Sequence, residues 1–474
     1  MIYKLFHKNI EVLTADFTLE SNVFNKIIGI SNEDHIPIGL TTIPGMDLTK
    51  ALNFWWQSRL IPKNRNNFKN EILLANILKD CNGFNLSDHY WIKPEKSDMT
   101  WEKGNYIQNC FNENIGKYLI SKNTNLQNMT SDSPDFFSNG EQDKRWVINK
   151  NIRTLLKYGI PPYYQQPFNE MLASEICRRL NIPHVSYSFI VKGREKPLIY
   201  SSCPCFIDEN TEYVPAGFIQ YVLKKEKGIT DYKHLLNCCK AINMKNIDEI
   251  EKKITEMNIV DYITANTDRH YGNFGFLRDV NTLEWKGFAP IFDTGNAMFY
   301  ENPTSDLRKS KALMENVISK NFAQTQKKQI IKFATKEAYL NVDFSKLKGI
   351  DNYYFYILQN NPKVDNERAT LLSKLLLERI ETVQRLILIN NNVTKEFLSN
   401  INKNTENIPF INKVASEKKK IEIKEEKNNI IINNYLKNLN STSLSELETL
   451  IKKDIEAMCK NNRGVNKSKL DDDN

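Results

Sequence analysis

The sequence predicts an α+β fold, with sheet-forming and helical regions in different parts of the chain. Residues 144–206 are patterned as two strands, a helix and two further strands. Residues 305–400, by contrast, repeat apolar side chains mainly at helical spacing. At roughly 150 residues per domain, the 474 residues correspond to about three domains. A chain of this size can bury a core and form a substrate cleft.

The composition is that of a folded protein with a mild basic excess. Hydrophobic residues make up 41% and aromatic residues 11% of the chain, which excludes collagen-like, mucin-like and wholly disordered classes. Lysine and arginine number 65 against 57 aspartate and glutamate residues, giving a net charge of +8. Spread over the whole chain, this charge does not identify nucleic acid as a partner, and we expect no direct nucleic-acid binding.

The cysteines and the apolar runs indicate the cellular compartment. Eight cysteines are scattered without the spacing of a disulfide framework, and the first residues lack an apolar secretory core. No uncharged run approaches the roughly 20 residues that cross a bilayer. We therefore expect a cytoplasmic protein with no membrane contact. Cys203 and Cys205, and the pair Cys238 and Cys239, lack the gap and histidine partners of a zinc finger, so we interpret them as structural.

Taken in order, the chain begins with a region of unknown role, residues 1–130. Short apolar clusters alternate there with turn signals, and tryptophans at positions 55, 56, 91 and 101 supply large apolar anchors. This pattern predicts a folded region without visible catalytic chemistry.

A sheet-forming region follows. The runs at 144–149 and 152–157 are rich in β-forming residues and stand at hairpin spacing. A helix is predicted over 169–181, with Asn169 as its N-cap and a break at the following Ile-Pro step. Two further strands are predicted at residues 185–192 and 197–206.

The remainder of the chain is mostly helical in pattern. An amphipathic helix is predicted over 247–266, and a second hairpin is predicted from the runs at 274–279 and 283–292. Beyond residue 405, charged runs flank a short helix predicted at 443–460. We expect this tail to be solvated.

The chemistry concentrates in the loop after the 247–266 helix. Asp268 and Asn273 stand five residues apart, which is the separation between the base and the metal-binding asparagine in a protein-kinase catalytic loop. Asp293 follows the second hairpin, where a kinase places its metal-binding aspartate. Phosphoryl transfer needs these groups because its catalysis is mostly positioning and charge neutralisation. The alternative is a polar loop that collects Asp and Asn for turn chemistry alone.

A kinase also needs a cation for the nucleotide phosphates. Lys157 closes the second strand of the first hairpin, upstream of the loop as required, although it could instead be an exposed lysine at a strand end. Glu170, near the start of the following helix, could pair with Lys157 or could be an exposed acid at a helix N-terminus. Gly140 would allow a turn before the hairpin to approach phosphates closely.

The order of these motifs resembles the HipA-like serine/threonine kinases. The resemblance rests on SNGEQDKRW, LLK, CPCFIDENTEYVPA, NTDRHYGNFGF and APIFDTG, and it runs from about residue 131 to about residue 395. It implies a two-lobed fold related to the protein kinases and the phosphatidylinositol 3/4-kinases. The lobes would be residues 131–210 and a mostly helical 211–404, with 405–474 as a tail.

The resemblance also implies roles for residues. Lys157 and Glu170 would serve ATP, with Gly140, Gln142 and Lys144 in a phosphate loop. Asp268 would be the catalytic aspartate, and Mg²⁺ would be held by Asn273 and Asp293. The implied activity is ATP- and Mg²⁺-dependent phosphorylation of serine or threonine in a protein, with autophosphorylation of the phosphate loop.

Two other functions fit the same motifs. One is a catalytically silent binding protein of a toxin–antitoxin or mobile-element system, with a helix-turn-helix, antitoxin-like partner. The other is a lipid or small-molecule kinase, because the DRHxxN string is shared with phosphatidylinositol kinases.

His270 follows the aspartate here, whereas ordinary protein kinases place a histidine before it. We expect His270 to organise the loop by hydrogen bonding.

Overall fold

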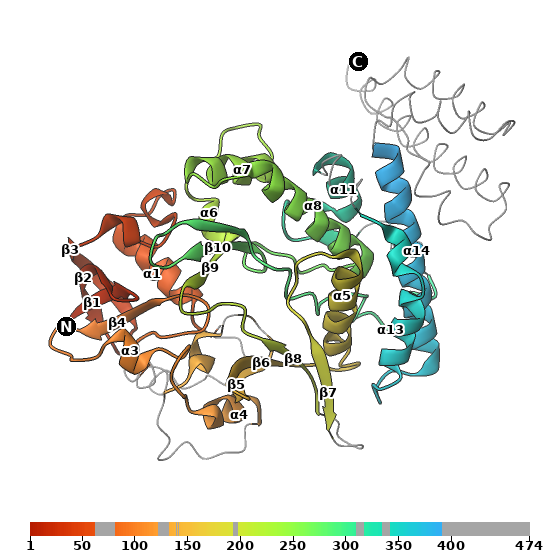
Figure 1. Cartoon of the computed structure of the whole chain (residues 1–474), viewed down its shortest axis with the longest axis horizontal. Coiled ribbons are helices and arrows are strands. Elements are labelled where there is room, and N and C mark those ends of the chain that lie inside the picture. The colour runs from red at the N-terminus through yellow and green to blue at the C-terminus, as the bar shows by residue number, and fades with distance from the viewer. Residues whose placement is uncertain are drawn as a thin grey trace, which may run out of the picture. The chain divides into compact units, whose positions relative to one another are not determined.

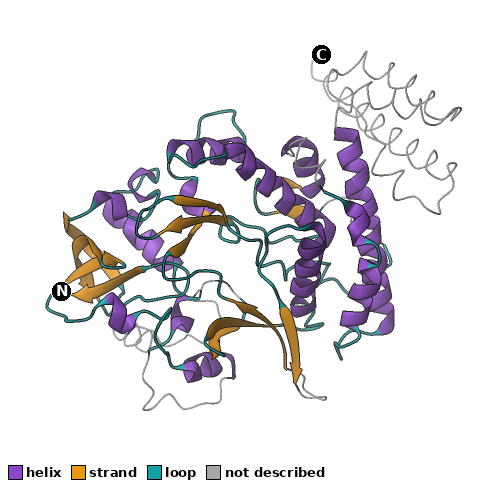
Figure 2. Ribbon diagram, in the orientation of Figure 1, coloured by secondary structure: helices purple, strands orange, loops and turns teal. Residues whose placement is uncertain are grey.

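The computed structural model describes residues 1–61, 81–121, 132–138, 140, 142–192, 198–309, 317–333 and 342–390. The chain divides into two compact units, residues 1–342 with 346–383, and residues 343–345 with 384–474. The first unit holds all the described sheets (Figures 1 and 2). The predicted tail, including its 443–460 helix, lies outside the described residues.

The N-terminal region contains a four-stranded antiparallel sheet in the order β3-β2-β1-β4. Its strands are β1 (Ile2–His7), β2 (Ile10–Thr18), β3 (Val23–Ile30) and β4 (Tyr90–Pro94). Helix α1 (Leu48–Ser58) follows an N-cap at Asp47, whose side chain accepts a hydrogen bond from the Lys50 amide at 2.8 Å.

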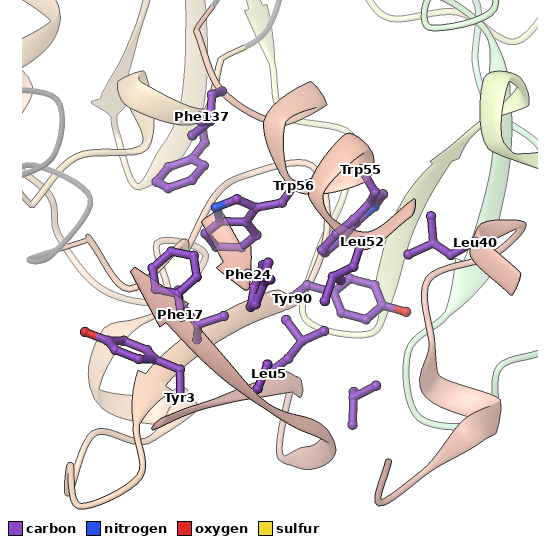
Figure 3. Close-up of a cluster of buried hydrophobic side chains, with 14 of the residues drawn as sticks. Tyr3, Leu5, Phe17, Phe24, Leu40, Leu52, Trp55, Trp56, Tyr90 and Phe137 are labelled. Carbon is purple, nitrogen blue, oxygen red and sulfur yellow. The ribbon is translucent and has the colours of Figure 1, made fainter. Parts of the chain in front are cut away.

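Aromatic side chains fill the core between α1 and this sheet (Figure 3). The Trp56 ring lies 5.6 Å from Phe24 and 6.3 Å from Phe17, in edge-on contacts. Edge-on packing is a favoured geometry for aromatic pairs, because ring edges and ring faces carry opposite partial charges. The tryptophans at positions 55, 56, 91 and 101 are all buried in hydrophobic clusters, as large apolar anchors should be. Its smaller elements are η1 (Glu33–His35), η2 (Leu40–Thr42), α3 (Trp101–Gly104), α4 (Glu113–Ser121) and η3 (Pro134–Phe137).

His89, just before β4, makes the stability of this region depend on pH. Its side chain is fully buried, and neither ring nitrogen has a hydrogen-bond partner among the described residues. Burial lowers the pKa of His89 to about 4. The unfolded chain, with a histidine pKa of about 6.5, therefore binds a proton before the folded chain does, so stability falls as the pH drops from about 6.5 to about 4.

We expect this single histidine to cost about 3 kcal/mol of unfolding free energy between pH 7 and pH 4. His89→Phe keeps a ring against Trp101, whose ring centroid lies 4.9 Å away, and removes the titration. Urea unfolding across this pH range should therefore show a flatter curve for the variant. Parallel curves for the two proteins would contradict the assignment.

The second sheet confirms the predicted order of two strands, a helix and two strands. Strands β5 (Lys144–Asn149) and β6 (Ile152–Tyr158) form the hairpin, and both turn residues have positive φ, as the type I′ turn requires. Strands β7 (Ser188–Lys192) and β8 (Leu198–Pro204) complete the sheet in the order β5-β6-β8-β7. The predicted turn between β7 and β8 lies outside the described residues.

Helix α5 (Gln166–Leu180) lies against this sheet (Figure 1). Its start differs from the predicted one. It begins three residues before Asn169, so Asn169 is not its N-cap. Pro167 in the first turn fits a helix start, since its missing N–H has no partner there anyway. Asn169 is instead buried and donates hydrogen bonds to the carbonyls of Gly295 and Ala297, at 2.9 and 2.8 Å.

A third sheet, in the order β11-β10-β9, leads into the candidate site. The predicted hairpin is β10 (Gly275–Asp279) with β11 (Trp285–Phe288), and the additional strand is β9 (Thr211–Pro215). Buried Glu212 on β9 pairs with Arg278 on β10 at 2.6 Å and with His7 on β1 at 3.0 Å. This polar cluster joins the N-terminal sheet to the third sheet.

The predicted helix after residue 246 is α8 (Ile247–Thr264), which ends where Ala265 takes a left-handed conformation. A small hairpin, β12 (Ile318–Ser319) with β13 (Gln324–Thr325), interrupts the region predicted to be mainly helical. The other described helices are α6 (Ala216–Ile219), α7 (Asp231–Ala241), α9 (Thr304–Leu307), α11 (Gln326–Phe333), η4 (Phe344–Leu347), α13 (Ile350–Leu358) and α14 (Asn366–Asn390). Within the described part of the chain, no helix is both long and apolar enough to cross a membrane.

Candidate active site

A buried lysine–glutamate pair joins the second sheet to α5. Lys157 lies near the end of β6, and its Nζ is 2.9 Å from Oε1 of Glu170. The two side chains are 4% and 2% exposed. Neither is therefore the exposed strand-end lysine or exposed helix-start acid that the sequence left open.

Asp293 completes a three-residue charge cluster with this pair. Its Oδ1 lies 2.5 Å from Lys157 Nζ, and the amide of the next residue, Thr294, donates to Glu170 Oε2 at 2.9 Å. Burial acts to lower the pKa of Lys157, but Asp293 and Glu170 outweigh it and raise that pKa well above its ordinary value. The lysine is therefore charged at neutral pH.

The carboxyl of Asp293 stays ionised. Burial acts to raise its pKa, but the charges of Lys157 and Lys144 hold the pKa well below its usual range. A charged carboxylate beside two lysines can bind a cation or organise the lysines around an anion.

The loop from Asn266 to Asn273 is held by Arg269, whose side chain is fully buried. Its guanidinium pairs with Asp261 of α8 at 2.9 Å. It also donates to the carbonyl of Asn273 at 2.8 Å and to the carbonyl of Phe292 at 2.5 Å. One arginine thus fixes both the loop and the segment that carries Asp293.

Asp268 lies in this loop with both carboxylate oxygens engaged. Oδ2 accepts a hydrogen bond from Asn296 Nδ2 at 2.9 Å, and Oδ1 pairs with Lys320 Nζ at 2.5 Å. His270 Nδ1 accepts the Gly272 amide at 3.0 Å, so His270 organises the loop as expected.

Asn273 and Asp293 present oxygen atoms that suit a hard cation. Asn273 Nδ2 donates to the Asp268 carbonyl at 3.1 Å, which fixes the amide orientation. Asn273 Oδ1 and Asp293 Oδ2 accept no hydrogen bond from any described residue. Amide and carboxylate oxygens are the ligands that Mg²⁺ prefers. The residues therefore fit this ion.

The predicted phosphate loop lies beside Lys157. Gly140 has φ of +101°, a conformation that L side chains rarely adopt, and a Cβ there would meet Lys144 Nζ at 2.8 Å. Gln142 Nε2 donates to the Tyr158 carbonyl at 2.6 Å. Lys144 lies directly opposite Lys157 in the β5–β6 register. Two lysines thus face the same side of the hairpin.

The structure therefore brings Lys157, Glu170 and Asp293 into one cluster and ties Asp268 and Asn273 to it through Arg269. Their roles toward ATP and Mg²⁺, and those of Gly140, Gln142 and Lys144, stay predictions. Sequence reasoning missed Arg269, Asn296 and Lys320. Arg269 directly follows Asp268, which is a signal that could have drawn attention to it. The other two residues carry no such spacing signal.

Comparison with known proteins identifies one curated relative of the chain. No protein-family model matches the chain. The serine/threonine-protein kinase CtkA of Helicobacter pylori is 28% identical over 202 residues, which are 41% of this chain and 56% of the relative. The chain thus spans a little over half the length of this curated relative. It resembles the HipA-like kinases.

Two solved structures are similar in part to this chain. The crystal structure of a Helicobacter pylori proinflammatory kinase, CtkA, matches with a TM-score of 0.42 and 20% identity, covering 51% of this chain and 92% of that chain. HipA from the Shewanella oneidensis complex of HipA, HipB and operator DNA matches with a TM-score of 0.48 and 11% identity, covering 80% of this chain and 97% of that chain. In the candidate site, a sheet lysine pairs with a helix glutamate, which is an arrangement that protein kinases also have.

Proposed function

We propose that this chain is a serine/threonine protein kinase that transfers the γ-phosphate of ATP, with Mg²⁺, to a protein hydroxyl. The observation that supports this most directly is the bonding of Lys157 Nζ to both Glu170 and Asp293, at 2.9 and 2.5 Å. Protein kinases need their lysine–glutamate pair and metal-binding aspartate in place together. The sequence similarity to CtkA, a serine/threonine kinase, adds a second argument.

Each group has a role that suits its surroundings. Lys157 and Lys144 supply positive charge for the phosphates of ATP. Asn273 and Asp293 would hold Mg²⁺, which when bound neutralises charge on the phosphates. Asp268 orients the acceptor hydroxyl and takes its proton as the hydroxyl oxygen attacks the γ-phosphorus.

An acceptor screen with γ-labelled ATP and Mg²⁺ tests this function. The acceptors are casein, phosphatidylinositol vesicles and water, and the chain itself is a fourth acceptor. We expect label on serine or threonine of casein and of the chain itself. Label in the lipid alone would identify a lipid kinase, and ATP binding without any transfer would identify a silent binding protein.

Lys144→Met provides a milder test of the phosphate loop. We expect roughly tenfold weaker ATP affinity, because one charge-assisted contact to a phosphate is lost. The free energy of unfolding should stay within about 1 kcal/mol of wild type, because the variant loses both the repulsion from Lys157 directly opposite and the attraction to Asp293. Calorimetric titration with ATP and Mg²⁺, together with urea unfolding, measures both. Lys327→Met, at an exposed helix position, is the control, and wild-type affinity in Lys144→Met would contradict the assignment.

The partner and the compartment remain proposals. HipA in the Shewanella oneidensis structure is in complex with HipB and operator DNA. For this chain, the family resemblance implies a helix-turn-helix, antitoxin-like partner, and its composition is consistent with a cytoplasmic protein.

A further inference from the structure

Lys320 occupies a position that the proposed catalytic roles do not explain. It lies in the turn between β12 and β13, 52 residues after Asp268, and its Nζ is 2.5 Å from Asp268 Oδ1. The lysine side chain is 63% exposed and the aspartate side chain 22%. An ion pair this exposed contributes little to stability, because water and salt screen it. Its placement therefore calls for a reason other than folding.

The turn that carries Lys320 is firmly anchored. The next residue, Asn321, is buried, donates to Asn258 Oδ1 at 3.2 Å and accepts from Gln329 Nε2 at 2.7 Å. Phe322 is buried beside the loop, with its ring 6.0 Å from Tyr271 and 6.1 Å from Phe274. The backbone is thus fixed close to the loop, while the side chain of Lys320 is largely exposed.

The other described cations near the site have partners other than Asp268. Lys157 is bonded to Glu170 and Asp293, and the charge of Lys144 also acts on Asp293. Arg269 is fully buried, pairs with Asp261 and donates to backbone carbonyls. Among the described residues, Lys320 is the cation that forms an ion pair with Asp268.

We propose that Lys320 is a further catalytic residue, whose ammonium group moves from Asp268 to the γ-phosphoryl group of ATP during transfer. The proposal rests on the function proposed above. In the resting protein Lys320 occupies the Asp268 oxygen that the acceptor hydroxyl needs. An arriving γ-phosphate offers the ammonium several negative oxygens, and the flexible four-carbon stem of lysine can follow them. Its move then frees Oδ1 for the hydroxyl.

The transfer step balances with Lys320 charged throughout. The acceptor oxygen forms a bond to the γ-phosphorus, and the bond from that phosphorus to the β–γ bridging oxygen breaks. ADP leaves with the electron pair of that bond, and the hydroxyl proton passes to Asp268. Lys320 gives up no proton. It stabilises the negative charge on the phosphoryl oxygens while the phosphoryl group moves from ADP to the acceptor oxygen.

Lys320→Met tests the proposal, with Lys320→Arg as the conservative variant and Lys327→Met as the matched control. Turnover is measured with γ-labelled ATP, Mg²⁺ and casein. We expect Lys320→Met to lower kcat roughly 100-fold, as the loss of one charged contact to the transition state does. The Arg variant should stay within about tenfold of wild type, because it keeps the charge, and the control should match wild type.

Nucleotide binding supplies a readout that a purely structural role would not change. Lys320→Met should weaken the affinity for a non-hydrolysable ATP analogue, measured by calorimetry, and leave the affinity for ADP unchanged. The reason is that Lys320 would contact the γ-phosphate alone. An active wild type with an equally active Lys320→Met variant would overturn the role of Lys320 and leave the kinase proposal standing. A wild type that transfers no phosphate at all would overturn both proposals.

Discussion

Asp268→Asn is expected to lower phosphoryl transfer by at least roughly 1,000-fold while nucleotide affinity stays within about threefold of wild type. An amide keeps the size of the side chain but cannot take the acceptor proton. The phosphates are held elsewhere, by the cluster around Lys157 and Asp293, so binding should survive. Turnover with γ-labelled ATP and calorimetry with ATP and Mg²⁺ measure the two effects separately.

A matched control for this change is Asp98→Asn, which removes an equal charge from a side chain that is 98% exposed. We expect it to transfer phosphate like the wild type. An Asp268→Asn protein with wild-type turnover would remove Asp268 from the catalytic role. A variant that loses transfer and ATP binding together would indicate a loop that has lost its structure.

Arg269→Met is expected to lower the free energy of unfolding by about 3–5 kcal/mol. The arginine is fully buried and bonds to Asp261, so its removal leaves a buried carboxylate without its countercharge. The carbonyls of Asn273 and Phe292 lose a donor in the same step. Urea unfolding measures the loss, and a change below about 1 kcal/mol would show that Arg269 does not hold the loop.

The double variant Arg269→Met, Asp261→Leu separates charge from packing. If the cost of Arg269→Met comes from the unpaired carboxylate, then removing the carboxylate as well should recover much of the lost stability. A double variant less stable than Arg269→Met would show instead that the shape of the side chain matters most.

Local patterns account for the parts of the fold that the sequence predicted well. The β5–β6 hairpin depends on two neighbouring β-rich runs and a short turn, and α8 depends on a 3.6-residue repeat. The predicted start of α5 was wrong. Asn169 is a residue type that often caps helices, but here it lies inside the helix and donates hydrogen bonds to carbonyls more than 120 residues away. The pairing of β9 with β10 is equally non-local.

The candidate site also contains some residues that could be predicted from local patterns and others that could not. Asp268, Asn273 and Asp293 could be predicted because their types and spacing reflect a known chemistry, and the pairing of Lys157 with Glu170 was one of two interpretations that the sequence left open. Arg269 could not be predicted as buried, since arginine is mostly exposed and its burial depends on Asp261 and on the carbonyl of Phe292, 23 residues away. Lys320 reaches Asp268 only because the β12–β13 turn is anchored at Asn321.

The most direct test of the proposed function is mass-spectrometric phosphosite mapping after the purified chain is incubated with casein and ATP that carries ¹⁸O in its γ-phosphate. We expect ¹⁸O-labelled phosphoserine or phosphothreonine with Mg²⁺ present, and none with EDTA or in the Asp268→Asn variant. Labelled sites that persist in EDTA would contradict the metal assignment. The absence of any labelled phosphosite in the wild type with Mg²⁺ would contradict the account that this site transfers phosphate to protein.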